Sequence, residues 1–312
     1  MLSTNNTLAN IKSKIDELVK DGMMVYNLYF EEQILYRIGF YKTDIYTYYF
    51  DTKLHEKKIY FNDSFNIMDI YSLYQFDHEL RSLIINLCTC VEMKFKVFIS
   101  NCIYDISSGK EYLDISNFKN EKHYKDLIYH VNRKRISEDI SSHINDNTKY
   151  TCNTKLHIYL ICELLTFGEI SKMYGNLQNG LKKKIIMDNY NNRDVTKSWL
   201  YVDGWLKSIC DMRNICAHNG KLFDWKNTFK NEISLPRINK YKEYKNQRGS
   251  LFSILLVTKL LFEDKYFIES DNTWNLFIDN LDNCINKYTF SCKDFNPLDY
   301  MGFPSDWIVR LS

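Results

Sequence analysis

The residues best suited to chemistry lie together between Trp199 and Gly220. If this segment is helical, its polar side chains recur at steps of four, three and four residues and share one face. A histidine can accept or donate a proton near neutral pH, so a stripe that ends in one could support acid–base catalysis. A polar stripe is more often a solvated helix face, so the pattern alone indicates only exposure. The stripe consists of Lys207, Asp211, Asn214 and His218.

Arg213 adds a second chemical feature to this segment. It projects from the apolar face, about 140° from His218 on an ideal helix. Burying an arginine is costly unless a fixed anion compensates its charge. The anion could be a carboxylate inside the bundle, with Glu92 or Asp77 as candidates, or a phosphate, which suits the planar donor fork of arginine. Convergence of Arg213 and His218 requires helix fraying near Gly220, the long reach of arginine, or a second subunit.

A basic segment after Pro236 is the next candidate, because five cations minus one glutamate leave it a charge of +4. Cations attract the RNA backbone, and interleaved tyrosine rings can stack on unpaired bases. The alternative is an exposed charged linker. With the lysine of the polar stripe, the candidate RNA-contacting residues are Lys207, Arg237, Lys240, Tyr241, Lys242, Tyr244, Lys245 and Arg248.

The remaining charged and histidine residues are interpreted as structural. Arg81 and Glu92 fall within about 20° of each other on one helix stripe and are expected to be a scaffold pair. The basic triplet Lys182–Lys184 is either a surface collar or a weak RNA contact. No carboxylate cluster or Cys/His spacing indicates a metal site, and no cofactor is expected. Surface or packing roles are expected for His78, His123, His130, His143 and His157.

Composition predicts an all-α fold to carry these residues. The chain of 312 residues holds only 10 glycines and 3 prolines, and all three prolines follow residue 235. Few helix breakers favour long helices over a many-turned β fold. The net charge of +2 excludes attraction to a polyanion by bulk charge alone, so any such site must be a local patch.

Apolar periodicity predicts where the helices lie. Residues 1–62 form two or three short helices that pack on the main domain. The aromatic stretch 41–50 is compatible with a strand or a helix, and a helix is favoured because its neighbours are helical. The main domain, 63–235, starts with a long helix over 63–105, and residues 236–312 hold the basic segment and the C-terminal helices. Further helices are expected at 121–146, at 154–167 ended by Gly168, at 196–219 with Gly220 as C-cap, and between 249 and 288.

The chain is expected to be cytoplasmic. No run reaches the roughly 20 apolar residues of a membrane span, and the polar N-terminus does not resemble a secretory signal. Nine cysteines, an odd number without any C-x-x-C pair, indicate reduced and mostly buried thiols.

Arg213 to His218 resembles the R-x4-H motif of HEPN-domain ribonucleases. More broadly, the chain is similar to the Abi (abortive-infection, AbiD/AbiF-like) family of bacterial phage-defence proteins. Where the motif ordinarily continues as His-x-Arg-aromatic, this chain has Asn219-Gly-Lys-Leu-Phe, which removes the basis for a second phosphate contact there. The resemblance runs from about residue 30 to the C-terminus and rests on Ile70–Arg81 with Val91-Glu92, Glu163–Tyr174, Arg213–Asn219 and Met301–Trp307.

This resemblance implies a HEPN-type helical bundle with additional N- and C-terminal helices. It implies a homodimer in which two motifs face one cleft, and metal-independent RNA cleavage by attack of the ribose 2′-OH. His218 would act as base or acid, Arg213 would hold phosphate oxygens, and Asn214 would orient the ring of His218 or the phosphate. The resemblance also implies a toxin-like antiphage effector, with an antitoxin or a regulatory small RNA as a possible partner.

Two other functions remain open at the level of sequence. One is a non-catalytic RNA-binding module of the same fold, in which the motif and the +4 segment hold an RNA without cutting it. The other is a helical scaffold in which Arg213 is only a buried ion pair.

Overall fold

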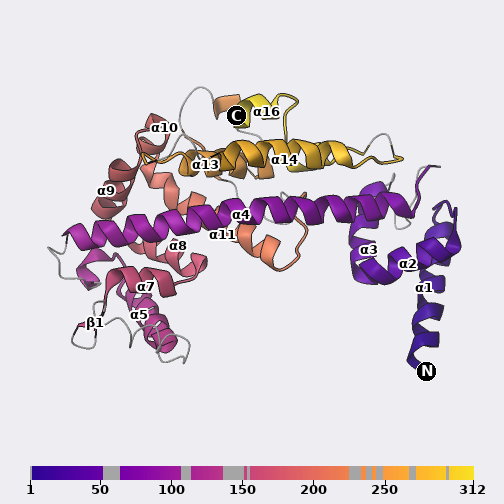
Figure 1. The fold of residues 1–312 in the computed structure, drawn as a ribbon, viewed down its shortest axis with the longest axis horizontal. Helices are drawn as coiled ribbons and strands as arrows, with labels where there is room; N and C mark the ends of the chain where they lie inside the picture. The colour runs from indigo at the N-terminus through magenta and orange to yellow at the C-terminus, as the bar shows by residue number, and fades with distance from the viewer. Residues whose placement is uncertain are drawn as a thin grey trace.

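A computed structural model describes residues 2–51, 64–106, 114–135, 151–152, 155–224, 233–236, 241–243, 249–266, 272–292 and 295–312. The described chain is a helical bundle, which confirms the expected all-α class (Figure 1). Its helices are α1 (Leu2–Lys20), α2 (Leu28–Ile38), α3 (Phe40–Thr47), α4 (Ile67–Ile106), α5 (Glu121–Arg135), α7 (Ile158–Leu164), α8 (Phe167–Asn176), α9 (Asn179–Asn189), α10 (Arg193–Thr196), α11 (Val202–Ala217), α13 (Leu251–Phe262), α14 (Thr273–Lys287), α15 (Pro297–Met301) and α16 (Trp307–Leu311).

The described elements also include 3-10 turns and one small hairpin. The turns are η1 (Tyr48–Phe50), η2 (Ile115–Asn117) and η4 (Trp199–Tyr201). The hairpin pairs β1 (Thr151–Cys152) with β2 (Lys155–Leu156) in antiparallel register. Its two-residue strands leave the all-α class unchanged.

Helix α4 is the axis of the molecule (Figure 1). It spans 40 residues, or about 60 Å, and no glycine or proline interrupts it. Apolar residues at three- and four-residue steps, such as Leu80, Ile84, Leu87 and Val91, are fully buried or nearly so. The sequence pattern therefore predicted this helix correctly, although it begins at Ile67 instead of residue 63.

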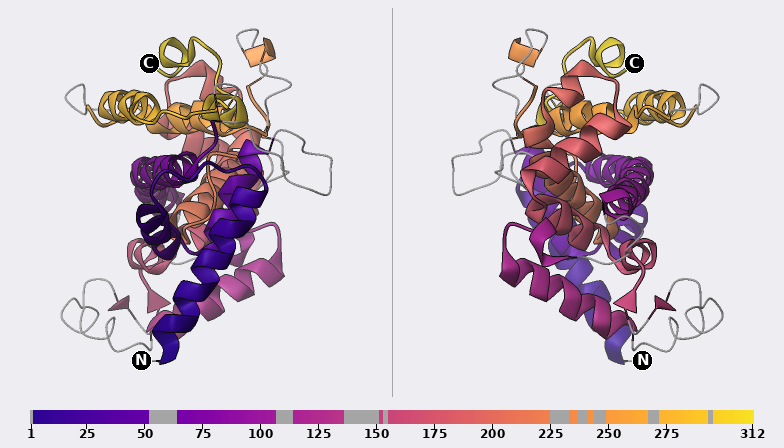
Figure 2. Two further views of the ribbon diagram at one scale, coloured as in Figure 1. Left: turned by 90° about the vertical axis from the view of Figure 1, so that its right-hand side faces the viewer. Right: turned by 90° about the vertical axis from the view of Figure 1, so that its left-hand side faces the viewer.

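The other helices surround α4 on several sides. The N-terminal helices α1–α3 gather at its N-terminal end, and α13 and α14 run along one side of it. Helices α7 and α8 also pack on α4, and α11 packs on α4, α8 and α13; Figure 2 shows the bundle from its two ends. The helix that carries the motif, α11, thus packs directly on α4, and α8 lies beside both.

Several helix boundaries differ from the sequence prediction, and the helix expected from residue 154 begins at Ile158, after β2. Gly168 does not end a helix but lies in the first turn of α8. The break falls at Leu165 and Thr166, where the Thr166 hydroxyl and the Glu169 carboxylate cap each other's backbone N–H groups. The helix expected over 196–219 is divided as well, because α10 ends at Thr196 and α11 begins at Val202.

Most described cysteines are buried, as expected. Cys88, Cys162 and Cys216 lie in the core, and burial raises the pKa of each thiol. Among the helices that the structure describes, none combines the length and the apolar composition needed to cross a bilayer. The cytoplasmic location and the three-part domain division stay predictions.

Candidate functional site

The C-terminal end of α11 presents His218 to solvent. The helix ends at Ala217, and His218 is its exposed C-cap. Asn219 adopts φ 54°, and the backbone N–H of Gly220 donates to the carbonyl of Ile215 over 2.9 Å. The sequence prediction of Gly220 as the C-cap is therefore wrong, because His218 is the C-cap and Asn219 adopts the left-handed conformation. A larger residue at 220 would crowd the Ile215 side chain, because an added Cβ would lie 3.0 Å from it.

A buried carboxylate on α4 fixes the chain that follows His218. Asp77 Oδ1 accepts hydrogen bonds from the backbone N–H groups of Leu222 (3.0 Å) and Phe223 (2.8 Å). The Tyr46 hydroxyl of α3 donates to Asp77 Oδ2 over 2.7 Å. Arg81, one turn further along α4, forms an ion pair with the same oxygen. Burial raises the pKa of the Asp77 carboxyl, and the charge of Arg81 opposes that shift.

Two cations near this carboxylate also hold the end of the motif. Arg81 Nη1 donates to the Gly220 carbonyl over 2.9 Å, and Lys42 Nζ of α3 donates to the Asn219 carbonyl over 2.6 Å. Burial and the nearby charge of Arg81 lower the pKa of Lys42. We call Asp77 with Arg81 the Asp77–Arg81 clamp. The clamp and Lys42 fix the two residues next to His218, so its backbone is held while its side chain faces solvent.

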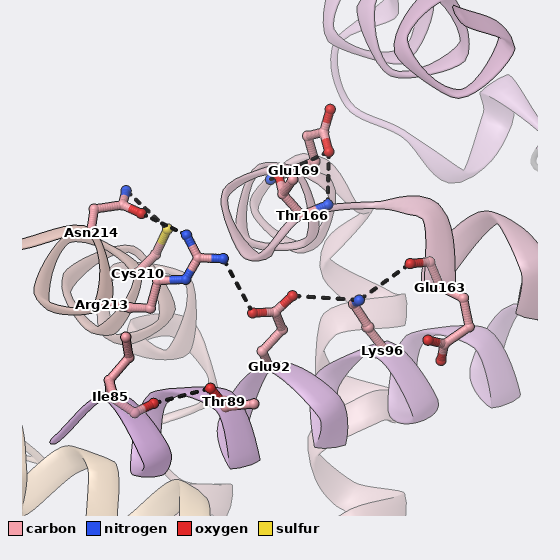
Figure 3. Close-up of polar contacts among 10 residues, drawn as sticks. All are labelled: Ile85, Thr89, Glu92, Lys96, Glu163, Thr166, Glu169, Cys210, Arg213 and Asn214. Atoms are coloured by element: carbon pink, nitrogen blue, oxygen red, sulfur yellow. Dashed lines mark hydrogen bonds and ion pairs between the residues drawn. The ribbon is translucent and has the colours of Figure 1, made fainter. Parts of the chain in front are cut away.

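Arg213 lies on the side of α11 that faces α4 (Figure 3). Its Nη1 donates to the side-chain oxygen of Asn214 over 3.1 Å, and its Nη2 lies 3.8 Å from Glu92 Oε2. The Arg213 side chain is 31% exposed. Glu92 was one of the two partners expected from the sequence. The pair is a single long contact rather than a bidentate one, so part of the guanidinium fork faces solvent.

Glu92 is shared between two cations. Its other oxygen lies 3.4 Å from Lys96 Nζ, which also donates to the Glu163 carbonyl over 3.3 Å (Figure 3). Both charged side chains of α4 are largely buried. A carboxylate shared in this way neutralises only part of the charge of Arg213.

The structure does not join the three motif residues into one hydrogen-bonded group. Within the described residues, no hydrogen bond or ion pair links Arg213 to His218. The amide of Asn214 contacts Arg213 and the thiol of Cys210, at 3.8 Å, instead of the imidazole. Asn214 thus orients Arg213, whereas the sequence interpretation assigned it to His218 or a phosphate.

The polar stripe of α11 lines a groove of about 600 Å³ against α8. We call it the α8–α11 groove. Lys207, Asp211 and Asn214 lie on one wall, as the helical spacing predicted, whereas His218 lies beyond the end of the stripe that lines it. The other wall comes from α8 and was not expected. The full lining is Gly168, Ser171, Lys172, Gly175, Asp203, Gly204, Lys207, Cys210, Asp211 and Asn214.

Most of the basic segment predicted to contact RNA lies outside the described residues. Lys242 is described and exposed. Tyr241 is buried, and its hydroxyl donates to Asp194 over 3.2 Å. Its ring is therefore covered by protein and not presented for base stacking, which corrects that assignment. The predicted residues outside the described part are Arg237, Lys240, Tyr244, Lys245 and Arg248.

Two other charged assignments also change. Arg81 and Glu92 lie about three turns apart on α4 and do not pair with each other, because Arg81 contacts Asp77 and Glu92 contacts Arg213. Lys182 is not part of a surface collar. It is buried and forms an ion pair with Asp203 of α11 over 2.9 Å.

The clamp is the part of the site that sequence reasoning missed. Asp77 was considered only as a partner of Arg213, and Arg81 only as a partner of Glu92. The available signal was their four-residue spacing among Leu73, Phe76 and Leu80, because opposite charges on an apolar helix face must satisfy each other when buried.

Replacing Glu92 with glutamine tests whether Arg213 is available to a phosphate. The change keeps the side-chain shape and removes the anion between Arg213 and Lys96. We expect RNA to bind severalfold more tightly, with a steeper dependence of log K on log salt concentration, because both cations lose their internal counterion. Titrations of fluorescent RNA at several salt concentrations measure both. Glu121→Gln, on exposed α5, is the control; a lower melting temperature of Glu92→Gln with unchanged RNA affinity would indicate a purely structural pair.

Comparison with known proteins identifies one family. A family model described as "Abi-like protein" matches residues 33–224, which is more than half of the chain. The match covers the clamp, Glu92, the α8–α11 groove and the whole of α11. No curated protein and no solved structure is significantly similar to the chain.

Proposed function

The chain belongs to the Abi-like protein family, and on that basis we propose that it is a metal-independent endoribonuclease of a bacterial abortive-infection system. The proposal combines the antiphage role expected of this family with the acid–base and phosphate-binding chemistry of Arg213 and His218 on α11. HEPN-type cleavage by the R-x4-H residues is the mechanism proposed for it.

The observation that carries this proposal is that Arg213 and His218 are both accessible to solvent while the surrounding residues hold them in place. Arg213 is held by Asn214 and Glu92 but keeps part of its fork exposed. His218 is exposed on a backbone that the clamp and Lys42 hold in place. A partly exposed arginine and an exposed histidine on a fixed backbone suit a site that binds a phosphate and moves a proton.

The proposed reaction is transesterification within the RNA strand. A histidine accepts the proton of a ribose 2′-OH, and that oxygen bonds to the adjacent phosphorus. The bond from phosphorus to the 5′-oxygen of the next nucleotide breaks, and that oxygen takes a proton from an acid. Arg213 stabilises the charge on the non-bridging oxygens. The products are a 2′,3′-cyclic phosphate and a 5′-hydroxyl.

A homodimer provides both proton-transfer groups in this scheme. On one ideal helix Arg213 and His218 point about 140° apart, and one chain offers one His218. Two copies that face each other across a cleft would supply one His218 as base and the other as acid. Such an effector would have to be restrained before infection, by an antitoxin or a regulatory small RNA.

Cleavage in the presence of EDTA tests the proposed function. We expect the purified protein to cut single-stranded RNA at the same rate with and without EDTA, because its own side chains supply the proton transfer and the charge stabilisation. A 2′-O-methyl RNA of the same sequence should stay intact, since it lacks the attacking hydroxyl. Gel electrophoresis of end-labelled RNA measures both. Equal cleavage of the two RNAs would contradict attack by the 2′-OH.

A non-catalytic RNA-binding module is the second candidate. The absence of a direct contact between Arg213 and His218 within the described residues favours it, because binding does not require the two side chains to converge. This function predicts RNA that remains intact for hours while bound, with an affinity that falls steeply with salt.

A further inference from the structure

The α8–α11 groove is built from one stripe of each helix. On α8 the lining residues follow steps of three, one and three, from Gly168 through Ser171 and Lys172 to Gly175. On α11 they run over three turns, from Asp203 to Asn214. Side chains at such steps share a face, so the groove follows the line where the two helices meet.

Three of the ten glycines in the chain line this groove, and internal packing does not require them. A Cβ added at Gly175 or Gly204 would meet no atom within 4 Å. At Gly168 the nearest atom would be Cys210 Sγ at 3.7 Å, an ordinary contact. All three have backbone angles that other residues adopt, and glycine is among the least favoured residues in a helix. Because these three residues have no side chains, the α8–α11 groove has space for a ligand.

A serine hydroxyl without a protein partner faces that space. Ser171 lines the groove, and the residue as a whole is 8% exposed. Within the described residues its hydroxyl has no hydrogen-bond partner, and its oxygen is not enclosed by protein, so it is open to the groove. A ligand in the groove could use this hydroxyl as a donor or as an acceptor.

The charges of the groove favour a ligand that is both polar and anionic. Asp203 forms an ion pair with the buried Lys182, which compensates the negative charge of its carboxylate. Lys172 and Lys207 are exposed on opposite walls. Partial burial raises the pKa of Asp211, and Lys207 opposes that shift. Lysines can contact a phosphate, while a carboxylate, an amide and a hydroxyl can bond the edge of a base.

We infer that the α8–α11 groove binds one nucleotide of a single-stranded RNA, beside the phosphate that Arg213 holds. The inference rests on the proposed function for the identity of the strand. The groove has about 600 Å³, within the range of small-ligand sites. It is continuous with the motif through Asn214, which lines the groove and bonds Arg213. A nucleotide here would place its neighbouring phosphate towards the arginine.

A second copy of the chain is the competing occupant, since small residues also allow helices to pack closely. Subunit interfaces are depleted of charged residues at their centre. Four charged side chains line this groove: Lys172, Asp203, Lys207 and Asp211. The lining therefore matches a nucleotide better than the face of another helix.

Filling the groove tests the inference. Gly175→Gln and Gly204→Gln each place a long uncharged side chain where an added Cβ meets no atom within 4 Å. Gly180→Gln, in the first turn of α9, is the matched control, because it has equal space and lies outside the groove lining. The probe is a fluorescein-labelled single-stranded 2′-O-methyl oligoribonucleotide, which the proposed chemistry cannot cut. Binding is measured by anisotropy and the mass of each variant by light scattering.

Both groove variants are expected to bind the probe about tenfold to a hundredfold more weakly, which is the effect of losing one bound base. Gly180→Gln should bind as the unchanged protein does, and none of the three should melt at a lower temperature. Unchanged affinity of the groove variants, no binding by the unchanged protein, or a fall in mass from dimer to monomer would each overturn the inference. The probe is not cleaved, so this experiment measures binding separately from cleavage. If the groove variants lose binding and the unchanged protein leaves RNA uncut in the EDTA experiment, only the catalytic proposal is contradicted.

Discussion

Replacing His218 with alanine should lower the rate of RNA cleavage by about 10²–10⁴, the usual contribution of a general acid or base. Replacing Arg213 with alanine should lower it by about 10²–10³, because a fixed positive group no longer stabilises the charged phosphorane-like transition state. His218 is exposed, and among the described residues Arg213 forms one long ion pair and one hydrogen bond to the neighbouring Asn214, so neither change should unfold the protein. Initial rates with saturating RNA and melting temperatures measure the two effects separately.

Matched variants distinguish catalysis from a general loss of charge or of histidine. His78→Ala removes an exposed histidine from α4, and Arg37→Ala removes an exposed arginine from α2; both should cleave at the unchanged rate. Arg213→Lys should recover only part of the lost activity, because lysine keeps the charge but not the planar fork. Cleavage at the unchanged rate by both His218→Ala and Arg213→Ala would exclude these residues as the catalytic pair.

Replacing Asp77 with alanine should reduce the free energy of unfolding by about 3–5 kcal/mol, the cost of leaving a buried partner charge uncompensated. Asp77 is fully buried and Arg81 nearly so. The change also removes the acceptor of two backbone N–H groups after the motif. Urea unfolding measures the loss. Cleavage should fall as well, because the backbone beside His218 is no longer held.

An ion pair with an exposed carboxylate provides the control for this prediction, and its Lys14 keeps Glu17 as a second partner. Asp44 contacts Lys14 over 2.7 Å and is 58% exposed, so Asp44→Ala should cost less than about 1 kcal/mol. In the double variant Asp77→Ala/Arg81→Ala, the second change should cost much less than Arg81→Ala alone, because the two charges compensate each other. A small and additive pair of effects would show that the clamp does not act as a unit.

The regular parts of the fold could be predicted because they follow from local periodicity. The apolar residues of α4 recur at helical steps over eleven turns, and no other secondary structure buries such a pattern on one side. The stripe formed by Lys207, Asp211 and Asn214 was also predicted, and it lines one wall of a groove. In both cases the residue spacing within a single segment is enough to predict the helix and which side chains share a face.

Features that depend on a second segment could not be predicted in the same way. The choice of Glu92 over Asp77 as the partner of Arg213 depends on how α11 lies along α4, and the spacing left both open. The wall that α8 contributes to the groove depends on its packing against α11. Tyr241 looked suited to stacking in a basic segment, but its hydroxyl reaches Asp194, far away in sequence.

The two incorrect helix ends have local causes. Gly168 was taken as a breaker because glycine disfavours helices, but the capping pair Thr166 and Glu169 starts a new helix just before it. Gly220 was predicted as the C-cap, but His218 is the C-cap and Asn219 adopts the left-handed conformation, while Gly220 lies close to the Ile215 side chain. Asparagine tolerates the left-handed region better than most residues, so either position was compatible with the sequence.

The chemical ends of the RNA products test the central claim most directly. The purified protein is incubated in EDTA with a single-stranded RNA, and the fragments are identified by mass spectrometry. Attack by the 2′-OH predicts 2′,3′-cyclic phosphate and 5′-hydroxyl ends, formed by the unchanged protein and not by His218→Ala. Fragments with 3′-hydroxyl and 5′-phosphate ends, or RNA that the unchanged protein leaves intact, would contradict the proposed ribonuclease.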